Sequence, residues 1–190
     1  GVDISQFPSN KTYPIPSDMT NFAHPIIGYT GLITSKRLNA DLLYEIVSRC
    51  PQFTFMMVGK EDEYFKNHHL HRLTNIHFLG EKNNKDIPSY IAAFDICINP
   101  QIINEITIGN YPRKIDEYLA LGKPVIATRT KAMSLFEEYV WNCDSADAYI
   151  KAIHEAIQNK NDSVINSRIQ FAHSHTWENS VIKLYQAIKS

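Results

Sequence analysis

The residues of this chain best suited to chemistry lie together in the stretch from Asn104 to Thr128. Arg113 and Lys114 directly follow Pro112, where a helix is expected to begin, and cations in a first helical turn oppose the helix dipole, so they call for a nearby anion such as a phosphate. Glu117 follows Lys114 by one turn, and its carboxylate can accept hydrogen bonds from vicinal hydroxyls such as those of a ribose. The alternative is a solvated face with an ordinary i, i+3 ion pair, which helix statistics alone favour.

The elements that would hold these side chains are a short helix and a buried strand. Pro112 suits the first turn of a helix because its φ is preset and it has no N–H to lose. Gly122 can adopt the left-handed conformation that closes a helix. The apolar run at 125–127 is bounded by breakers, as expected for a strand buried on both faces of a parallel sheet. Between the proline and the glycine, apolar residues recur at helical spacing: Ile115, Tyr118, Leu119 and Leu121.

This stretch also resembles a known family. The string PRKIDEYLALGKPVIAT is similar to the PxKxxEYLAxGKPVV segment of nucleotide-sugar glycosyltransferases of family 4, which have the GT-B fold. In that family the segment lies in the C-terminal, donor-binding domain. The resemblance implies that Glu117 holds the ribose hydroxyls of the donor and that Lys114 lies near its diphosphate.

A second candidate anion site follows the strand expected at 25–30. Gly31 stands in the turn that leads to a helix, a general geometry for binding phosphate, and the cations Lys36 and Arg37 follow it. From the residues alone, an ordinary surface turn is the simpler interpretation. The string GLITSKRLNADLL resembles the GxLxxxRxDxDLL start of the donor domain in a subset of family 4. This implies a close backbone approach at Gly31 and a diphosphate contact from Arg37, with Lys36 as a second, less specific cation.

A third candidate contact follows the strand expected at 75–79. The string NIHFLGEKNNKDIPSYIAAFDICINP looks like the NVxFLGxxxxxxLPxYLAxxDVxxxP block of the family. In family 4 the backbone after this glycine commonly contacts the nucleobase, so the resemblance implies that role for Gly80 and Glu81. The alternative is a simple strand-to-helix turn without ligand contact. In either case we expect Asp86 to cap the helix that follows this turn.

The sequence departs from the family pattern at one position. Family 4 usually carries a first glutamate that contacts the transferred sugar, but Gly109 stands at its place, eight positions before Glu117. Glu105 lies in an NEIT segment, and a similar NExT element occurs in the subset that carries PxK. Glu105 is therefore a candidate for the missing carboxylate, while a solvated loop glutamate is the alternative.

Composition limits the class of protein. The chain has 190 residues and a formal net charge of −1, which gives no electrostatic argument for nucleic acid as a partner. No apolar run is long enough to span a membrane. Three cysteines, Cys50, Cys97 and Cys143, are far apart and odd in number, so we expect reduced core residues of a cytoplasmic protein.

The histidines at 68, 69 and 71 are the strongest argument for a metal in the sequence. Adjacent His68 and His69 would point in different directions on a helix, and a metal site needs three or four convergent ligands. We therefore expect an exposed helix end with no metal.

The domain organisation is predicted from the ends of the chain. Residues 1–24 carry three prolines and no periodic pattern, which predicts a linker. Its opening GVDISQF resembles the NGVDxxxF element at the domain crossover of family 4, which implies that the acceptor-binding half is absent from this chain. Residues 25–190 are expected to form the donor domain, with a helix at 174–190 that crosses back to the other half.

The expected fold is α/β. Five or six short apolar strands alternate with helices, which predicts a doubly wound, Rossmann-like parallel sheet, one half of a GT-B fold. Ligands of such sheets bind at the carboxyl ends of the strands, and loops 30–37, 80–84 and 99–114 all follow strands there. We therefore expect one shared cleft.

The resemblance implies transfer of a hexose from a nucleoside diphosphate sugar to an acceptor glycan or glycolipid, with retention. Arg37 and Lys114 would stabilise the departing diphosphate, with no metal or other cofactor. The full-length protein would work in the cytoplasm, with peripheral association at the inner face of the membrane as an option. Two alternatives stay open: a GT-B sugar-nucleotide epimerase, and an inactive Rossmann-like scaffold.

Overall fold

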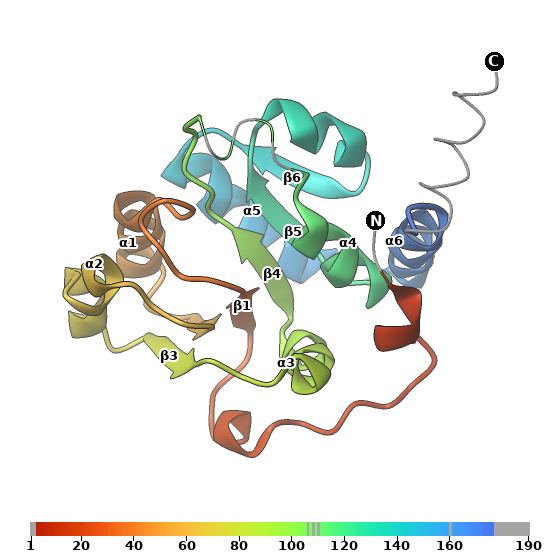
Figure 1. The fold of residues 1–190 in the computed structure, drawn as a ribbon, viewed down its shortest axis with the longest axis horizontal. Coiled ribbons are helices and arrows are strands. Elements are labelled where there is room, and N and C mark those ends of the chain that lie inside the picture. Colours follow the sequence, from red (N-terminus) through yellow and green to blue (C-terminus); the bar gives the residue numbers. More distant parts are fainter. Residues whose placement is uncertain (1–2, 106, 108, 110, 160, 177–190) are drawn as a thin grey trace.

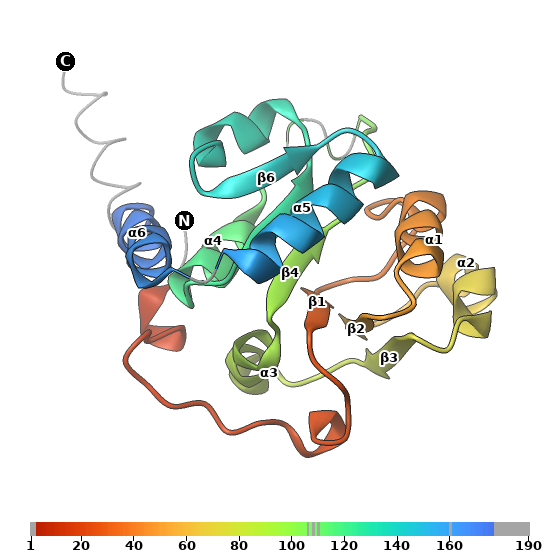
Figure 2. The same ribbon diagram turned by 180° about the vertical axis from the view of Figure 1, so that it is seen from behind.

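The computed structural model describes residues 3–105, 107, 109, 111–159 and 161–176. Its centre is one parallel sheet of six strands in the order β3-β2-β1-β4-β5-β6, with helices on both faces (Figures 1 and 2). The strands are β1 (Ile26–Thr30), β2 (Thr54–Val58), β3 (Ile76–Gly80), β4 (Ile96–Asn99), β5 (Val125–Thr128) and β6 (Val140–Cys143). The doubly wound, Rossmann-like prediction is therefore confirmed, and the sixth strand lies at the expected edge.

The helices follow the strands along the chain. They are α1 (Ala40–Arg49), α2 (Glu63–Lys66), α3 (Ile87–Ala93), α4 (Arg113–Ala120), α5 (Ala146–Gln158) and α6 (Asp162–Ser174). Five short 3-10 segments complete the described structure: η1 (Ile4–Gln6), η2 (Ser17–Met19), η3 (His69–Arg72), η4 (Asn84–Asp86) and η5 (Lys131–Phe136). The helix expected at the C-terminal end, with Trp177, lies outside the described residues.

Local sequence signals explain where the helices begin and end. Asn39 caps α1 by accepting a hydrogen bond from the N–H of Leu42 at 3.0 Å, and Pro51 follows the end of that helix. Helix α4 begins directly after Pro112, and Gly122 after its end has a φ of +69°. Asp86 occupies the predicted N-cap position of α3, but it also ends η4 and its side chain makes no capping hydrogen bond.

The sheet separates two apolar cores because alternate strand residues point to opposite faces. We call the layer between the sheet and α1 and α5 the first core, and the layer beneath α3, α4 and α6 the second core. Ile27 on β1 lies in the first core, whereas its neighbour Ile26 lies in the second. Cys50, Cys97 and Cys143 are free and buried, which confirms the expected core packing of the cysteines.

The described part of the segment 1–24 packs against the domain. Phe7 and Met19 are buried in the second core. Asp18 accepts a hydrogen bond from the Tyr90 hydroxyl at 2.9 Å and pairs with Lys82 at 2.8 Å. The role of this segment as an interdomain linker stays a prediction. Within the part of the chain that the structure describes, no helix is both long and apolar enough to cross a bilayer.

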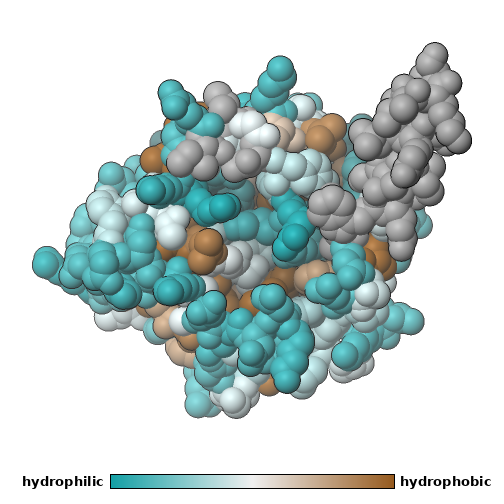
Figure 3. All heavy atoms as spheres, viewed as in Figure 1, coloured by the Kyte–Doolittle hydropathy of each residue, from teal (hydrophilic) through white to brown (hydrophobic). Residues whose placement is uncertain are grey.

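The topology sets the place of a ligand site. The strand order reverses between β1 and β4, where Gly28 lies opposite Met56 of β2 on one side and Cys97 of β4 on the other. In open parallel sheets, crevices form at such a reversal, outside the carboxyl ends of the strands. Figure 3 shows the surface in the same view as Figure 1. Hydrophilic side chains surround smaller apolar areas near its centre.

Candidate functional site

A pocket of about 510 Å³ lies at the carboxyl ends of β1, β2, β3 and β4. This volume falls within the range of small-ligand sites. All three loops expected to form one cleft line the pocket, so that expectation is confirmed. The polar and charged lining residues are Gln6, Tyr29, Thr30, Arg37, Lys60, Glu81, Lys82, Asn84, Asn99, Gln101, Thr107, Tyr111, Arg113, Lys114 and Glu117.

Two glycine turns form the floor of the pocket below β1 and β2. Gly31 has a φ of +130° and Gly59 a φ of +153°, conformations that disfavour other residues. A Cβ atom on Gly59 would lie 1.8 Å from the carbonyl oxygen of Gly31, so the two turns are in direct backbone contact. A Cβ on Gly31 would lie 3.0 Å from Nζ of Lys114. The expected close approach at Gly31 is therefore present, while its contact with a ligand stays a prediction.

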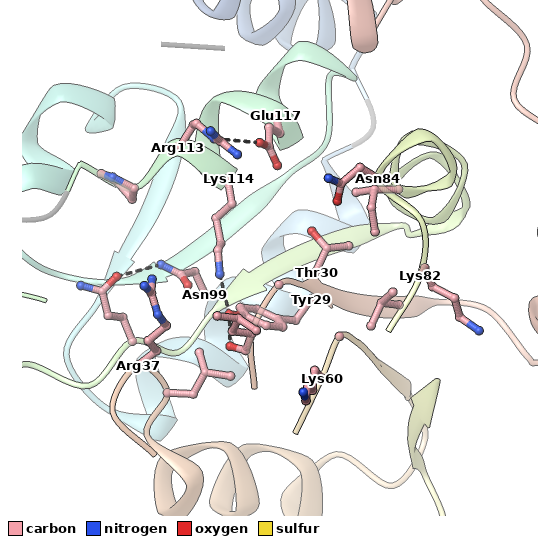
Figure 4. Close-up of a pocket in the computed structure, with 18 of the residues that line it drawn as sticks. Tyr29, Thr30, Arg37, Lys60, Lys82, Asn84, Asn99, Arg113, Lys114 and Glu117 are labelled. Atoms are coloured by element: carbon pink, nitrogen blue, oxygen red, sulfur yellow. Dashed lines mark hydrogen bonds and ion pairs between the residues drawn. The ribbon is translucent and has the colours of Figure 1, made fainter. Parts of the chain in front are cut away.

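Lys114 points from the first turn of α4 into this pocket (Figure 4). Its Nζ donates a hydrogen bond to the Tyr29 hydroxyl at 2.5 Å and lies 3.9 Å from the centre of that ring. Lys114 is half-buried, and its Nζ lies between the Tyr29 ring and the Gly31 turn. Burial lowers the pKa of Lys114 to about 7, Glu117 opposes this, and the positive charge of Arg37 adds to it.

Arg37 enters the pocket from the loop after β1. The backbone carbonyl of Arg37 accepts a hydrogen bond from the N–H of Ile102 at 3.0 Å, which joins the loops after β1 and β4. Its side chain lines the pocket wall beside Asn99 and Lys114 (Figure 4). Among the described residues no carboxylate pairs with Arg37. Arg37 and Lys114 are thus two of the five cationic residues that line the pocket, with Lys60, Lys82 and Arg113, and this positive charge favours an anionic ligand.

Glu117 lies on the same helix and lines the same pocket. Its side chain is 17% exposed, and Oε1 lies 3.3 Å from Nε of Arg113. Burial raises the pKa of Glu117, although Arg113 and Lys114 lower it. The ion pair on this face thus joins Arg113 and Glu117, and not Lys114 and Glu117 as the solvated-face alternative expected. Lys114 is left directed at the cavity.

The structure places the other predicted residues unequally. Glu81 lines the pocket, whereas Gly80 ends β3 beside it and is not part of the lining. Glu105 and Lys36 are exposed and lie outside the pocket wall. The sequence predicted that the Glu105 carboxylate contacts the transferred sugar. The loop after β4 instead presents Gln101 and Thr107 to the cavity.

Sequence reasoning missed several residues of the pocket. Tyr29 is fully buried within an apolar strand, so its position alone predicted core packing. Lys60 lies in a turn that carried no motif, and Asn84 lies in the expected loop 80–84 but was not itself singled out. Asn99 is 3% exposed and ends β4, and a polar residue closing an otherwise apolar strand is the one signal that could have marked it.

The histidine cluster differs from its prediction. His68 is not an exposed helix residue but is 9% exposed, and its ring stacks on that of His69 with centroids 4.0 Å apart. The reason is that His68 precedes the 3-10 segment η3 in an extended conformation, so helical rotation does not separate the rings. Asp41 joins them, with one possible ligand atom from each residue within 4.8 Å of the others.

The tautomer of His68 argues against a metal in this cluster. Nδ1 of His68 accepts a hydrogen bond from the N–H of Leu70 at 3.2 Å. Nε2, which lies 3.5 Å from Oδ1 of Asp41, therefore carries the proton and has no lone pair to offer. The expectation that the protein holds no metal stays a prediction.

The model of a protein family described as Glycosyl transferases group 1 matches residues 24–159. The chain belongs to this family. The group 1 glycosyl transferase domain is 28% identical over 186 residues to TuaH of Bacillus subtilis (strain 168), whose assignment as a teichuronic acid biosynthesis glycosyltransferase is provisional. That match covers 93% of this chain and 46% of TuaH.

Solved structures share the fold of the glycosyl transferase domain. Anabaena Alr3699/HepE in complex with UDP and glucose matches with a TM-score of 0.74 and 22% identity, over 100% of this chain and 55% of that one. A glycosyltransferase from Rickettsia africae ESF-5 matches with a TM-score of 0.74 and 20% identity, over 99% of this chain and 54% of that one. The chain thus spans about half the length of the relatives it matches.

These findings confirm the recognition of the chain as a C-terminal GT-B glycosyltransferase domain and its α/β fold. They do not favour an epimerase or an inactive scaffold. Assignment to family 4, the donor, the stereochemistry and the roles of the site residues stay predictions.

Proposed function

We propose that this domain binds a nucleoside diphosphate sugar in the pocket at the carboxyl ends of the strands. The diphosphate would lie over the Gly31 turn between Arg37 and Lys114, and the ribose hydroxyls would donate to Glu117. One observation carries the proposal: two cations share a pocket in which the ammonium of Lys114 has a pKa lowered by burial and by Arg37. A diphosphate supplies the negative charge that this arrangement favours.

UDP is the nucleotide we propose first, because the solved structure of HepE with the same fold is a complex with UDP and glucose. The uracil would lie toward the loop after β3, where Glu81 and Asn84 line the pocket. The resemblance to family 4 supports a hexose donor and a retaining reaction.

In this proposal the protein groups act on the leaving diphosphate. Cleavage of the bond to the anomeric carbon leaves negative charge on the phosphate oxygens, and Arg37 and Lys114 stabilise that charge where it develops. Together, Arg37 and Lys114 can fill the role that a metal ion has in other transferases. The acceptor would be a glycan or glycolipid held outside this domain, with the full-length protein at the inner face of a membrane as a further proposal.

Calorimetric titration of the domain with UDP, GDP and ADP tests the proposal. We expect UDP to bind best and Arg37→Ala to weaken it by about 10-fold or more, because a charge-assisted contact contributes about 1.5–3 kcal/mol. Lys36→Ala is the matched control, since Lys36 is the adjacent cation outside the pocket. If the wild-type domain and Arg37→Ala bind UDP with equal affinity, the proposed diphosphate contact of Arg37 is wrong.

A further inference from the structure

We propose that Tyr29 is a positioning residue, whose hydroxyl joins the glycine turn after β1 to Lys114 of α4 and holds the ammonium where the diphosphate binds. This inference rests on the proposed donor site. Nothing in the sequence motif marks Tyr29, which stands two positions before Gly31 in an apolar strand.

The hydrogen bonds of Tyr29 define both ends of this link. The Tyr29 hydroxyl donates to the carbonyl oxygen of Leu32 at 3.0 Å. A hydroxyl has one proton, so its oxygen is left to accept the hydrogen bond from Lys114 at 2.5 Å. Leu32 directly follows Gly31, and the hydroxyl therefore spans from the glycine turn to the helix that carries the cation.

Tyr29 is also rigid and stays protonated. The residue is fully buried, and burial raises the pKa of its phenol although Arg37 lowers it. The ring is held by the first core, so its hydroxyl has a fixed position. A fixed neutral acceptor suits an ammonium that must stay available to an anion, since a carboxylate in the same place would compete with the phosphate.

The hydrogen bond to Tyr29 matters because the Lys114 side chain can adopt other conformations. Its four-carbon side chain is flexible, and the guanidinium of Arg37 repels it across the pocket. Glu117 lies one helical turn away and attracts it. Lys60 and Arg113 line the same cavity and add further positive charge. Without the Tyr29 hydroxyl, we expect the ammonium to leave the Gly31 turn and move toward Glu117.

Tyr29→Phe tests the inference because it removes only the hydroxyl and keeps the ring. We expect UDP affinity to fall about 5- to 10-fold at pH 7, the size of one ordinary hydrogen bond, because the lost contact positions Lys114 and does not itself touch the nucleotide. In a Lys114→Ala background, Tyr29→Phe should cause no further loss, because the hydroxyl acts through Lys114. Tyr149→Phe is the matched control: Tyr149 is equally buried and its hydroxyl donates to the carbonyl of Asn99 at 2.9 Å, without touching Lys114.

Two results would overturn the inference: unchanged UDP affinity in Tyr29→Phe, or an equal loss with and without Lys114, which would indicate a purely structural role. A readout without nucleotide separates this inference from the proposed function. The Cε resonance of Lys114, followed by NMR as a function of pH, should titrate at higher pH in Tyr29→Phe than in the wild-type domain, since its ammonium leaves the buried turn for Glu117, which raises its pKa. If no nucleotide binds at all, the proposed function fails, and an unchanged Lys114 titration would independently refute the Tyr29 link.

Discussion

Lys114 places its ammonium in the pocket, where no carboxylate of the described residues pairs with it in the free domain. Its ammonium meets the Tyr29 hydroxyl, while Glu117 on the same helix is paired with Arg113 and Arg37 repels it. Such a residue is costly for the free protein and useful once an anion binds. The effects of pH and of substitution at this one position should therefore be opposite for stability and for binding.

The first prediction concerns protons. The pKa of Lys114 is about 7 in the folded domain, against 10.5 ordinarily, so between these values the unfolded chain binds a proton that the folded one lacks. The contribution of Lys114 to stability therefore rises with pH over this window. A bound diphosphate favours the ammonium, so UDP binding at pH 8 should take up as much as about one proton. Calorimetry in two buffers of different ionisation heat measures this, and zero uptake would contradict it.

The second prediction is that removing the charge of Lys114 stabilises the free domain and weakens UDP binding. Lys114→Met keeps the length of the side chain and removes the charge, so we expect the free domain to gain about 1 kcal/mol, or about 2–4 °C in Tm. UDP binding should be lost or weakened by about 10-fold or more. Thermal unfolding with and without UDP measures both effects. Lys36→Met, at an exposed position, serves as the control and should change neither; a lower Tm in Lys114→Met would refute the argument.

The sequence allowed some of these residues to be predicted and not others. Arg37, Lys114 and Glu117 stand in motifs, and the structure brings all three to one pocket. Tyr29 has the spacing of a core strand residue, and only the tertiary contact with α4 shows its hydroxyl facing Lys114. Glu105 was expected from its residue type and from the resemblance to the NExT element, and the structure leaves it exposed to solvent.

The glycine turns after β1 and β2 are the elements on which the pocket depends. Gly59→Ala would place a methyl group 1.8 Å from the carbonyl oxygen of Gly31, a backbone atom that cannot move without shifting the turn. We therefore expect a loss of stability of about 2 kcal/mol or more and a parallel loss of UDP affinity. Denaturant unfolding and calorimetry measure the two effects.

Gly80→Ala is the control for that substitution. Gly80 also has a positive φ, of +70°, but no atom lies within 4 Å of the place of a new Cβ. It should therefore show the conformational cost of about 1 kcal/mol and a smaller loss of UDP affinity than Gly59→Ala. If both variants lose affinity equally, strain rather than the contact with Gly31 is responsible.

The elements themselves were largely predictable because local signals agree with the fold. Pro112 and Gly122 bound α4 as the sequence predicts. The differences arise at short 3-10 segments: η4 ends at Asp86, whose side chain makes no capping hydrogen bond, and η3 begins after His68. Short 3-10 turns carry no apolar period, so the pattern of hydrophobic residues does not reveal them.

At the level of the molecule, this chain matches only about half the length of its relatives. It spans 46% of TuaH and 55% of HepE. We predict that the 190-residue chain binds the nucleotide but transfers little or no sugar, because the acceptor would be held outside it. A transfer assay with UDP-glucose and product analysis measures this. Transfer at about 1–1000 per second, typical of enzymes, would contradict the prediction.

The most direct measurement of the central claim is a crystal structure of this domain with UDP. We predict that the phosphate oxygens lie within about 2.7–3.2 Å of Nζ of Lys114 and of the Arg37 guanidinium, over the Gly31 turn, with the ribose hydroxyls at Glu117. Lys114 should keep its hydrogen bond to Tyr29. A nucleotide bound elsewhere, or one in this pocket whose diphosphate touches neither Arg37 nor Lys114, would contradict the account.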